Sequence, residues 1–267
     1  MHDPSDPRLA DYRLLNDQRA RRSVEGDDFF VAEGYVAIER VVDSGHRLRS
    51  VLLAPSRVER FVQLVGAGPL RRPDGSEVPI YVVDREVMAM AAGFDLHRGV
   101  VAAADRRPLP TVAEIASGSA RRLAVLAGLN DAENVGLIAR SARAFGVDAL
   151  VLDPTCTDSY ARRTVRVSMG EILHLPTARS SSWPEDLALL ADHGVETWAM
   201  TPDGADDIWS CDVPERVAVL LGAEGPGLDP QVIARATRRV RIPIADDVDS
   251  LNVGHAAAVA FARIALH

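Results

Sequence analysis

The sequence contains no lysine, so all 30 of its basic side chains are arginine. A GC-rich genome produces this bias, and guanidinium groups also favour fork-shaped contacts to phosphate. Cysteine is almost as scarce, because only Cys156 and Cys211 occur and neither belongs to a Cys-x-x-Cys or Cys/His cluster. We therefore expect two ordinary buried thiols, and neither a disulfide framework nor a zinc or other metal site.

A long apolar segment is also missing from the start of the chain. The first thirty residues contain no apolar run and are interrupted by charged residues such as Asp3, Arg8 and Asp11. This pattern predicts neither a secretory signal nor a membrane span, and we expect a cytoplasmic protein with no membrane partner. The 267 residues, 47% of them hydrophobic, can bury a core in one large or two ordinary domains.

The net charge of −8 is unusual for a protein that binds nucleic acid. The acidic excess is uneven, because residues 1–115 carry 16 Arg against 18 acidic residues, a net of −2. Residues 116–267 carry 14 Arg against 20 acidic residues, a net of −6. The first part of the chain is therefore nearly neutral and rich in arginine, which leaves contact with RNA open.

The first hundred residues predict a small α/β unit. Residues 8–22 carry five Arg and predict a basic amphipathic helix, whose polar face is either simply solvated or an arm that contacts RNA. Apolar runs of strand length and the segments between them predict further elements. We expect strands at 29–31, 50–53, 78–83 and 99–104, and helices at 33–43 and from residue 84.

Residues 105–120 contain two prolines and several small polar residues, which predicts the passage from one domain to another. We expect domains at 1–110 and 111–267. In the second, strands and helices alternate at a spacing that predicts a largely parallel sheet covered on both faces, with ligands at the carboxyl ends of its strands. The expected strands are 123–127, 150–152, 172–175, 197–200 and 217–221, and the expected helices are 134–145 and those from residues 158, 182 and 250.

Three segments place polar residues or glycines where expected strands end. In the first, Asn134 is predicted at a helix N-terminus and Arg140 follows six residues later. The second segment, 220–228, has three glycines in six positions and predicts a loop whose backbone approaches a ligand closely. In the third, Ser250 is expected to cap the final helix, with Asn252 in its first turn.

Together these segments resemble the three motifs of the SpoU (TrmH) family in the SPOUT methyltransferase superfamily, in the same order, over roughly residues 122–267. The stretch 167–176 is similar to another segment common in that family. More loosely, residues 30–34 resemble the start of a ribosomal-protein-like substrate-binding domain. The resemblance implies an α/β fold with a SPOUT-type parallel sheet and a C-terminal trefoil knot, preceded by a small α/β domain that binds substrate RNA.

The resemblance also implies an activity and a set of site residues. It implies a homodimeric enzyme that moves a methyl group from S-adenosylmethionine to a ribose 2′-hydroxyl of RNA. Ribosomal RNA is favoured over tRNA as the substrate. The residues implied to surround the reacting ribose are Asn134, Arg140, Glu224, Ser250 and Asn252. The residues implied to bind the cofactor are Leu221, Gly222, Glu224, Gly225, Gly227, Ile242, Pro243, Ser250, Leu251 and Asn252.

One role within this set follows from chemistry. A guanidinium group stays protonated in proteins, so we expect Arg140 to hold a phosphate beside the target ribose and not to accept the proton of the hydroxyl.

Two other functions are weighed against the methyltransferase. A dinucleotide-dependent oxidoreductase is disfavoured, because the glycines at 222–227 have the spacing GxxGxG and not GxGxxG. A non-catalytic RNA-binding protein on the same fold is the alternative. The presence of Asn134, Arg140, Ser250 and Asn252 favours the enzyme over it.

Overall fold

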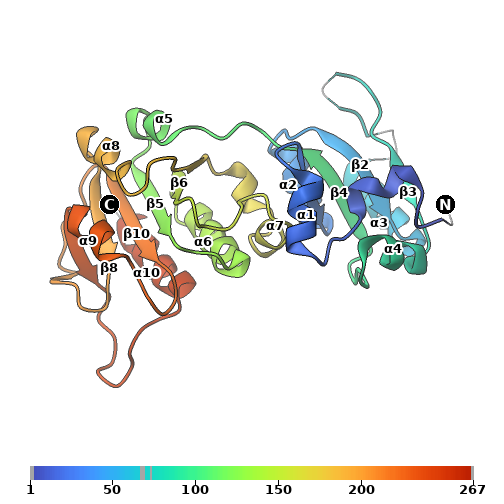
Figure 1. Ribbon diagram of the computed structural model, residues 1–267. Helices are drawn as coiled ribbons and strands as arrows, with labels where there is room; N and C mark the ends of the chain where they lie inside the picture. The colour runs from blue at the N-terminus through green and yellow to red at the C-terminus, as the bar shows by residue number, and fades with distance from the viewer. Residues whose placement is uncertain (1–2, 67–69, 73, 266–267) are drawn as a thin grey trace. The chain divides into compact units, whose positions relative to one another are not determined.

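The computed structural model describes residues 3–66, 70–72 and 74–265, which divide into two compact units (Figure 1). The first unit comprises the described residues up to Arg107 together with Tyr160–His174. The second comprises Pro108–Ser159 and the described residues from Leu175 onward. A break near residue 110 was expected, whereas the inclusion of Tyr160–His174 in the first unit was not.

The first unit is built on a four-stranded sheet with the strand order β1-β4-β2-β3. Strand β4 lies antiparallel to both β1 and β2, and β3 extends the sheet in parallel with β2. Apolar side chains fill β1, β2 and β4, which are almost entirely buried. The strand bounds are Phe29–Glu33 (β1), Leu48–Leu53 (β2), Ile80–Val82 (β3) and Val100–Asp105 (β4).

Short helices pack around this sheet. Leu9, Tyr12 and Leu15 bury their side chains in the same core as Phe29 and Met88. The helices of the first part of the chain are Pro7–Tyr12 (η1, a 3-10 helix), Gln18–Glu25 (α1), Tyr35–Asp43 (α2), Pro55–Arg57 (η2, a 3-10 helix), Val58–Val65 (α3) and Arg85–Ala92 (α4).

The single helix expected over residues 8–22 is therefore wrong. Leu14 adopts a φ of 55°, which ends the first helical segment. The carboxylate of Asp17 then accepts a hydrogen bond from the Ala20 amide at 2.9 Å, as a new helix begins. Arg8 pairs with Asp6, and Arg21 is buried, so the arginines of this segment do not share one exposed face. The side chain of Arg19 lies outside the described part of the chain.

The segment Tyr160–His174 joins the first unit through specific polar contacts. It contains Arg162–Val167 (α7) and Glu171–His174 (η3, a 3-10 helix). Arg162 forms an ion pair with the buried Glu33 of β1. Glu171 accepts a hydrogen bond from Arg40 at 3.0 Å. The strand expected at 172–175 is thus mostly a 3-10 helix, and the strand that follows begins two residues later.

A buried histidine also contacts the segment Tyr160–His174. His46 lies edge-on to the rings of Phe30 and Tyr160. Burial lowers the pKa of His46 to about 4, so its ring is neutral at pH 7.

The second unit is built on a seven-stranded sheet in which every pair of neighbours is parallel. Its order is β7-β6-β5-β10-β8-β11-β9, which confirms the predicted parallel α/β architecture. The central strands β5 and β10 are apolar runs buried along their length, as strands covered on both faces are. The bounds are Arg122–Ala127 (β5), Ala149–Leu152 (β6), Thr177–Arg179 (β7), Glu196–Met200 (β8), Asp206–Asp207 (β9), Val217–Gly222 (β10) and Arg238–Arg241 (β11).

Helix α5 precedes the first strand of the second unit and its other helices follow strands. Helix α10 packs against both α6 and β10. Thr111 and Glu114 form a capping box at the start of α5. The helix bounds are Val112–Ser117 (α5), Ala132–Ala144 (α6), Leu187–Asp192 (α8), Pro230–Arg235 (α9) and Val253–Ala265 (α10).

The two cysteines are free and buried, as expected. Burial raises the pKa of the Cys156 thiol to about 12, so this thiol is unreactive at neutral pH. Among the described residues, no group of His, Cys, Asp and Glu is arranged to hold a metal ion.

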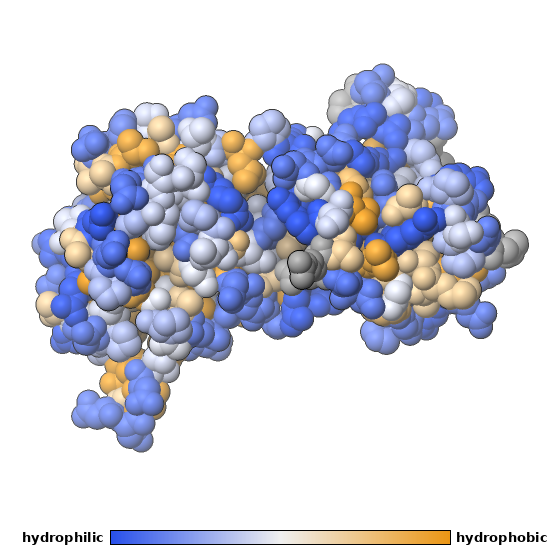
Figure 2. Space-filling view, viewed as in Figure 1, coloured by the Kyte–Doolittle hydropathy of each residue, from blue (hydrophilic) through white to orange (hydrophobic). Residues whose placement is uncertain are grey.

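Within the described ranges, no helix combines the length and apolarity that crossing a bilayer requires. On the face shown in Figure 2, hydrophilic residues predominate and hydrophobic residues appear in small groups between them.

The first unit contains a buried ion pair, and we expect its loss to lower the stability of the protein. The Glu25 carboxylate lies 2.7 Å from Arg21 Nε and 3.5 Å from Arg106 Nη2, and all three side chains are at most 8% exposed. We expect Glu25→Gln to lower the free energy of unfolding by about 3 kcal/mol, because it removes the carboxylate charge against which two buried guanidinium groups are packed. Denaturant unfolding of the purified protein measures this change.

Glu77→Gln is the matched control. Glu77 pairs with Arg71 at 3.2 Å, but both side chains are more than half exposed, so water screens the charge that remains. Equal destabilisation by the two substitutions would contradict a special contribution from the buried pair.

Candidate active site

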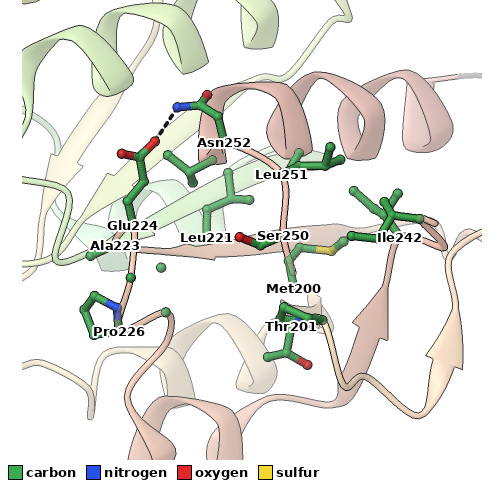
Figure 3. A pocket seen from close by; sticks show the side chains of 17 residues that line it. Met200, Thr201, Leu221, Ala223, Glu224, Pro226, Ile242, Ser250, Leu251 and Asn252 are labelled. Atoms are coloured by element: carbon green, nitrogen blue, oxygen red, sulfur yellow. Dashed lines mark hydrogen bonds between the residues drawn. The ribbon is translucent and has the colours of Figure 1, made fainter. Parts of the chain in front are cut away.

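A cavity of about 390 Å³ opens at the carboxyl ends of β8, β10 and β11 in the second unit (Figure 3). It lies where a parallel sheet normally binds its ligand. The chain reaches it three times, after β8, after β10 and before α10. Its lining residues are Met200, Thr201, Pro202, Leu221, Gly222, Ala223, Glu224, Gly225, Pro226, Gly227, Ile242, Ile244, Ser250, Leu251, Asn252, Val253 and Ala256.

The loop after β10 is shaped by its glycines. Gly227 donates its amide to the carbonyl of Ala223 at 2.9 Å, which closes a tight turn. Gly225 and Gly227 adopt φ values of 86° and 71°, which side chains disfavour. A Cβ atom at Gly222 would lie 2.3 Å from the carbonyl carbon of Gly227, so the two backbones can approach only because Gly222 has no side chain. The loop thus presents bare backbone to the cavity.

A polar network connects the three sequence segments that were expected to meet. The Asn252 amide nitrogen donates to the Glu224 carboxylate and to the side-chain oxygen of Asn134, the latter at 3.3 Å. Figure 3 shows Glu224 and Asn252 pointing toward each other, one from the loop after β10 and the other from the start of α10. Asn134 is only 8% exposed, so this end of the network is shielded from water.

The helix caps differ from those predicted. Asp131, not Asn134, caps α6 by accepting the amide of Glu133 at 2.9 Å, and Asn134 is the third residue of that helix. Asn252, not Ser250, caps α10, because its side-chain oxygen accepts the amides of Gly254 at 2.9 Å and His255 at 3.3 Å. Asn252 therefore uses both ends of its carboxamide.

Three of the predicted site residues do not line the cavity, and one of them, Asn134, is joined to its lining by the hydrogen bond from Asn252. Arg140 is exposed on α6, about 9 Å along the helix axis from Asn134, and is not among the lining residues. Within the described part of the chain it forms no ion pair. Pro243 does not line the cavity either, whereas its neighbours Ile242 and Ile244 do.

The contribution of β8 to the cavity was not predicted from the sequence. Met200, Thr201 and Pro202 line the cavity where this strand ends. The strand itself was predicted, and its place beside β10 would have pointed to these residues. That pairing cannot be deduced from one sequence, because β8 and β10 are separated by the short strand β9 along the chain.

The cavity is mainly apolar, with one charge. Glu224 is the only charged residue among the described residues that line it. Apolar walls from Met200, Leu221 and Ile242, exposed backbone groups and a single carboxylate suit a small organic ligand that has a flat apolar part and a positive charge.

Comparisons with known proteins place the chain among RNA methyltransferases. Residues 121–262 match the profile described as the SpoU rRNA Methylase family. An uncharacterized tRNA/rRNA methyltransferase of Mycobacterium tuberculosis is 41% identical over 269 residues, which cover 97% of this chain and 88% of that protein. A similarly named protein of Synechocystis is 34% identical over 67% of this chain and 64% of its own length.

Solved structures share the fold. An rRNA methyltransferase of Sinorhizobium meliloti with bound AdoMet has a TM-score of 0.80 at 24% identity, covering 99% of this chain and 96% of that one. A SpoU methyltransferase of Streptomyces viridochromogenes, in complex with AdoMet, has a TM-score of 0.79 at 20% identity, with 98% and 97% coverage. An RNA 2′-O ribose methyltransferase has a TM-score of 0.77 at 26% identity, with 100% and 97% coverage.

The double use of Asn252 predicts different outcomes for two substitutions. Asn252→Ala removes the cap and should destabilise the start of α10 by about 1 kcal/mol. Asn252→Asp keeps an oxygen that can accept the Gly254 and His255 amides, but it places a second carboxylate against Glu224. Hydrogen exchange at those two amides should therefore accelerate in Asn252→Ala and stay close to wild type in Asn252→Asp. Unchanged exchange in both variants would show that another group caps this helix.

Proposed function

Because the chain belongs to the SpoU rRNA methylase family, we propose that it methylates a ribose 2′-hydroxyl of RNA, in ribosomal RNA rather than tRNA. The observation that carries the proposal is the contact of Asn134, Glu224 and Asn252 beside the cavity. These residues come from three separate segments, and their side chains form one polar surface where a sugar hydroxyl can be held.

The cavity fits the methyl donor, S-adenosylmethionine. Its volume of about 390 Å³ lies within the range of small-molecule pockets. The apolar side chains of Leu221, Ile242 and Leu251 provide a slot for an adenine ring, and the bare backbone of the Gly222–Gly227 turn can bond polar groups of the donor. The Glu224 carboxylate can face its positive sulfur. S-adenosylmethionine supplies an activated methyl group, whose bond to sulfur breaks as the bond to oxygen forms.

The task of the protein is then mainly positioning. A hydroxyl must lie in line with the methyl group and sulfur, and holding it there removes much of the entropic barrier. Asn134 and Asn252 can bond the ribose, and Ser250 lines the same cavity as Asn252. A guanidinium group is a poor proton acceptor, so the role proposed for Arg140 is to grip the neighbouring phosphate. The hydroxyl proton then leaves to a phosphate oxygen or a nearby polar group.

The proposal includes a homodimer whose sites combine both chains. Arg140 lies outside the cavity lining of its own chain, which supports its action in a partner's site. Exposed apolar side chains at Leu137 and Leu251, on α6 and beside the start of α10, support an interface there.

The proposal also includes a trefoil knot. It is supported by the path of the chain between Arg241 and Val253, which returns from β11 across the sheet to reach α10 beside α6 and β10. We further propose that the first unit binds the substrate RNA and that the enzyme acts in the cytoplasm.

If the roles are divided as proposed, substitutions of Arg140 and of Gly222 should impair different steps, methyl transfer in the first case and donor binding in the second. Arg140→Ala should bind S-adenosylmethionine as the wild type does but transfer methyl groups about 100-fold more slowly, because the acceptor is misplaced. Gly222→Ala should not bind the donor, since its Cβ collides with Gly227. Calorimetry measures donor binding, and transfer to RNA from a strain lacking the protein measures activity. Arg143→Ala, on the same helix, is the control.

Normal transfer by Arg140→Ala would rule out an essential role for this residue. Donor binding with no transfer by the wild type, on any RNA, would favour the alternative of a non-catalytic RNA-binding protein.

The same two variants test whether sites are shared between chains. Arg140→Ala and Gly222→Ala subunits, co-expressed with different tags, give a mixed dimer with one intact donor cavity. If Arg140 acts in the partner's site, that cavity meets an intact arginine and the mixed dimer regains about half of the wild-type rate. A mixed dimer as inactive as its parents would place Arg140 in the site of its own chain.

A further inference from the structure

A second cavity adjoins the first across the loop after β10. Its volume is about 920 Å³, and it lies at the carboxyl ends of β5, β6 and β10. Ala223, Glu224, Pro226 and Gly227 line both cavities. Because β5 and β8 flank β10 on opposite sides, the loop forms a wall between two separate spaces. We call the second space the acceptor groove.

The acceptor groove is acidic. Four carboxylates line it, those of Asp131, Asp153, Glu224 and Asp229, and no arginine, lysine or histidine does so among the described residues. Asp153 is buried, with one oxygen bonded to the Gly128 amide at 2.8 Å and the other to the Cys156 amide at 2.7 Å. The other three carboxylates are exposed.

Two of these carboxylates keep an oxygen for a ligand. Asp131 and Asp229 each use one oxygen to cap a helix, by accepting the amides of Glu133 and Gln231. Among the described residues, no hydrogen bond reaches the second oxygen of either carboxylate. Fixed by the caps, they present acceptors at defined places on the rim of the groove.

The lining excludes two kinds of ligand. A phosphate would meet four negative charges with no counter-charge, which is unfavourable even in partly exposed sites. A metal ion is not suited, since no cluster of the described residues forms a metal site. The remaining fit is a neutral group with N–H donors, such as the polar edge of a nucleobase, which carboxylates accept.

An aromatic ring adds a second contact suited to a base. Trp183 packs against the hydrophobic core and also lines the groove, so its ring is held in place. Indole rings stack readily on the bases of single-stranded RNA.

The residues at the junction of the two cavities indicate how a nucleotide could be placed. Glu224 lines both, Asn134 lines the acceptor groove and Asn252 lines the donor cavity, and the three side chains are joined by hydrogen bonds. A ribose at this junction would have its base in the groove and its 2′-hydroxyl toward the donor. Its phosphates would remain outside the acidic lining.

Resting on the proposed methyl transfer, we propose that the acceptor groove seats the base of the target nucleotide and selects a base with an exocyclic amino group, against uracil. Adenine, cytosine and guanine each offer amino hydrogens to Asp131 and Asp229. Uracil has no exocyclic amino group, and its one N3–H donor on that edge lies between two carbonyl oxygens, which carboxylates repel.

The test uses substitutions that preserve the fold. Asp131→Asn and Asp229→Asn keep good helix-capping residues but remove the charge and replace an acceptor. The double variant should bind S-adenosylmethionine as the wild type does and show a rise of about tenfold in KM for RNA, as expected for lost base contacts. Asp192→Asn removes an exposed carboxylate outside both cavities and serves as the control. Trp183→Leu should also raise KM, whereas Trp183→Phe should retain much of the stacking.

A second measurement identifies the base directly. Total RNA from a strain lacking the protein is treated with the purified enzyme and S-adenosylmethionine, and digested nucleosides are analysed by mass spectrometry. The 2′-O-methyl nucleoside that increases should carry adenine, cytosine or guanine. An increase in 2′-O-methyluridine, or a double variant with wild-type KM, would overturn the assignment of the groove. A wild type that neither binds the donor nor transfers methyl groups would overturn the proposed function and this proposal with it.

Discussion

The carboxamide of Asn252 holds the site together. Its oxygen caps α10, and its nitrogen bonds both Glu224 and Asn134. A helix start is fixed by backbone geometry, so the nitrogen is aimed by the same bonds that begin the helix. The positions of the loop after β10 and of the first turn of α6 are therefore coupled to the packing of α10 on the sheet. The residue that caps the start of α10 therefore also holds together three segments that are distant in the sequence.

The parallel sheet was predictable because its strands are short apolar runs separated by helical segments, as β5 and β10 show. The caps of α6 and α10 were not, because several candidates compete within a few residues. Asp131 precedes Asn134, and Ser250 precedes Asn252, and each can cap a helix in isolation. Tertiary contacts decided both cases: Asn134 is buried against α10, and Asn252 is the residue next to both partners. The order of strands, which brings Thr201 to the cavity, also depends on long-range pairing that local patterns do not encode.

In the first unit, the number of arginines is a poor guide to how many of them are available on the surface. Arginines that seemed available for RNA are partly structural, because Arg21 and Arg106 surround the buried Glu25, and Arg162 pairs with Glu33. Buried guanidinium groups need such partners, and the acidic residues of this unit meet that need. The small net charge of residues 1–115 therefore includes ion pairs that are buried. It does not give the electrostatic potential at the surface of the unit. The segment Tyr160–His174 belongs to this internal pairing, although it is distant in sequence.

The shared wall between the two cavities constrains how Glu224 can contribute. A carboxylate near a positive sulfur stabilises the bound donor, but that attraction weakens as the sulfur becomes neutral during transfer. Taken alone, such a contact would favour binding over rate. The hydrogen bond from Asn252 engages part of the carboxylate's charge, so less of that charge is available to the sulfur. In the proposed transfer, Glu224 is thus better placed to align the two substrates than to drive the chemical step, and the larger share of the rate would come from fixing the ribose against Asn134 and the phosphate against Arg140.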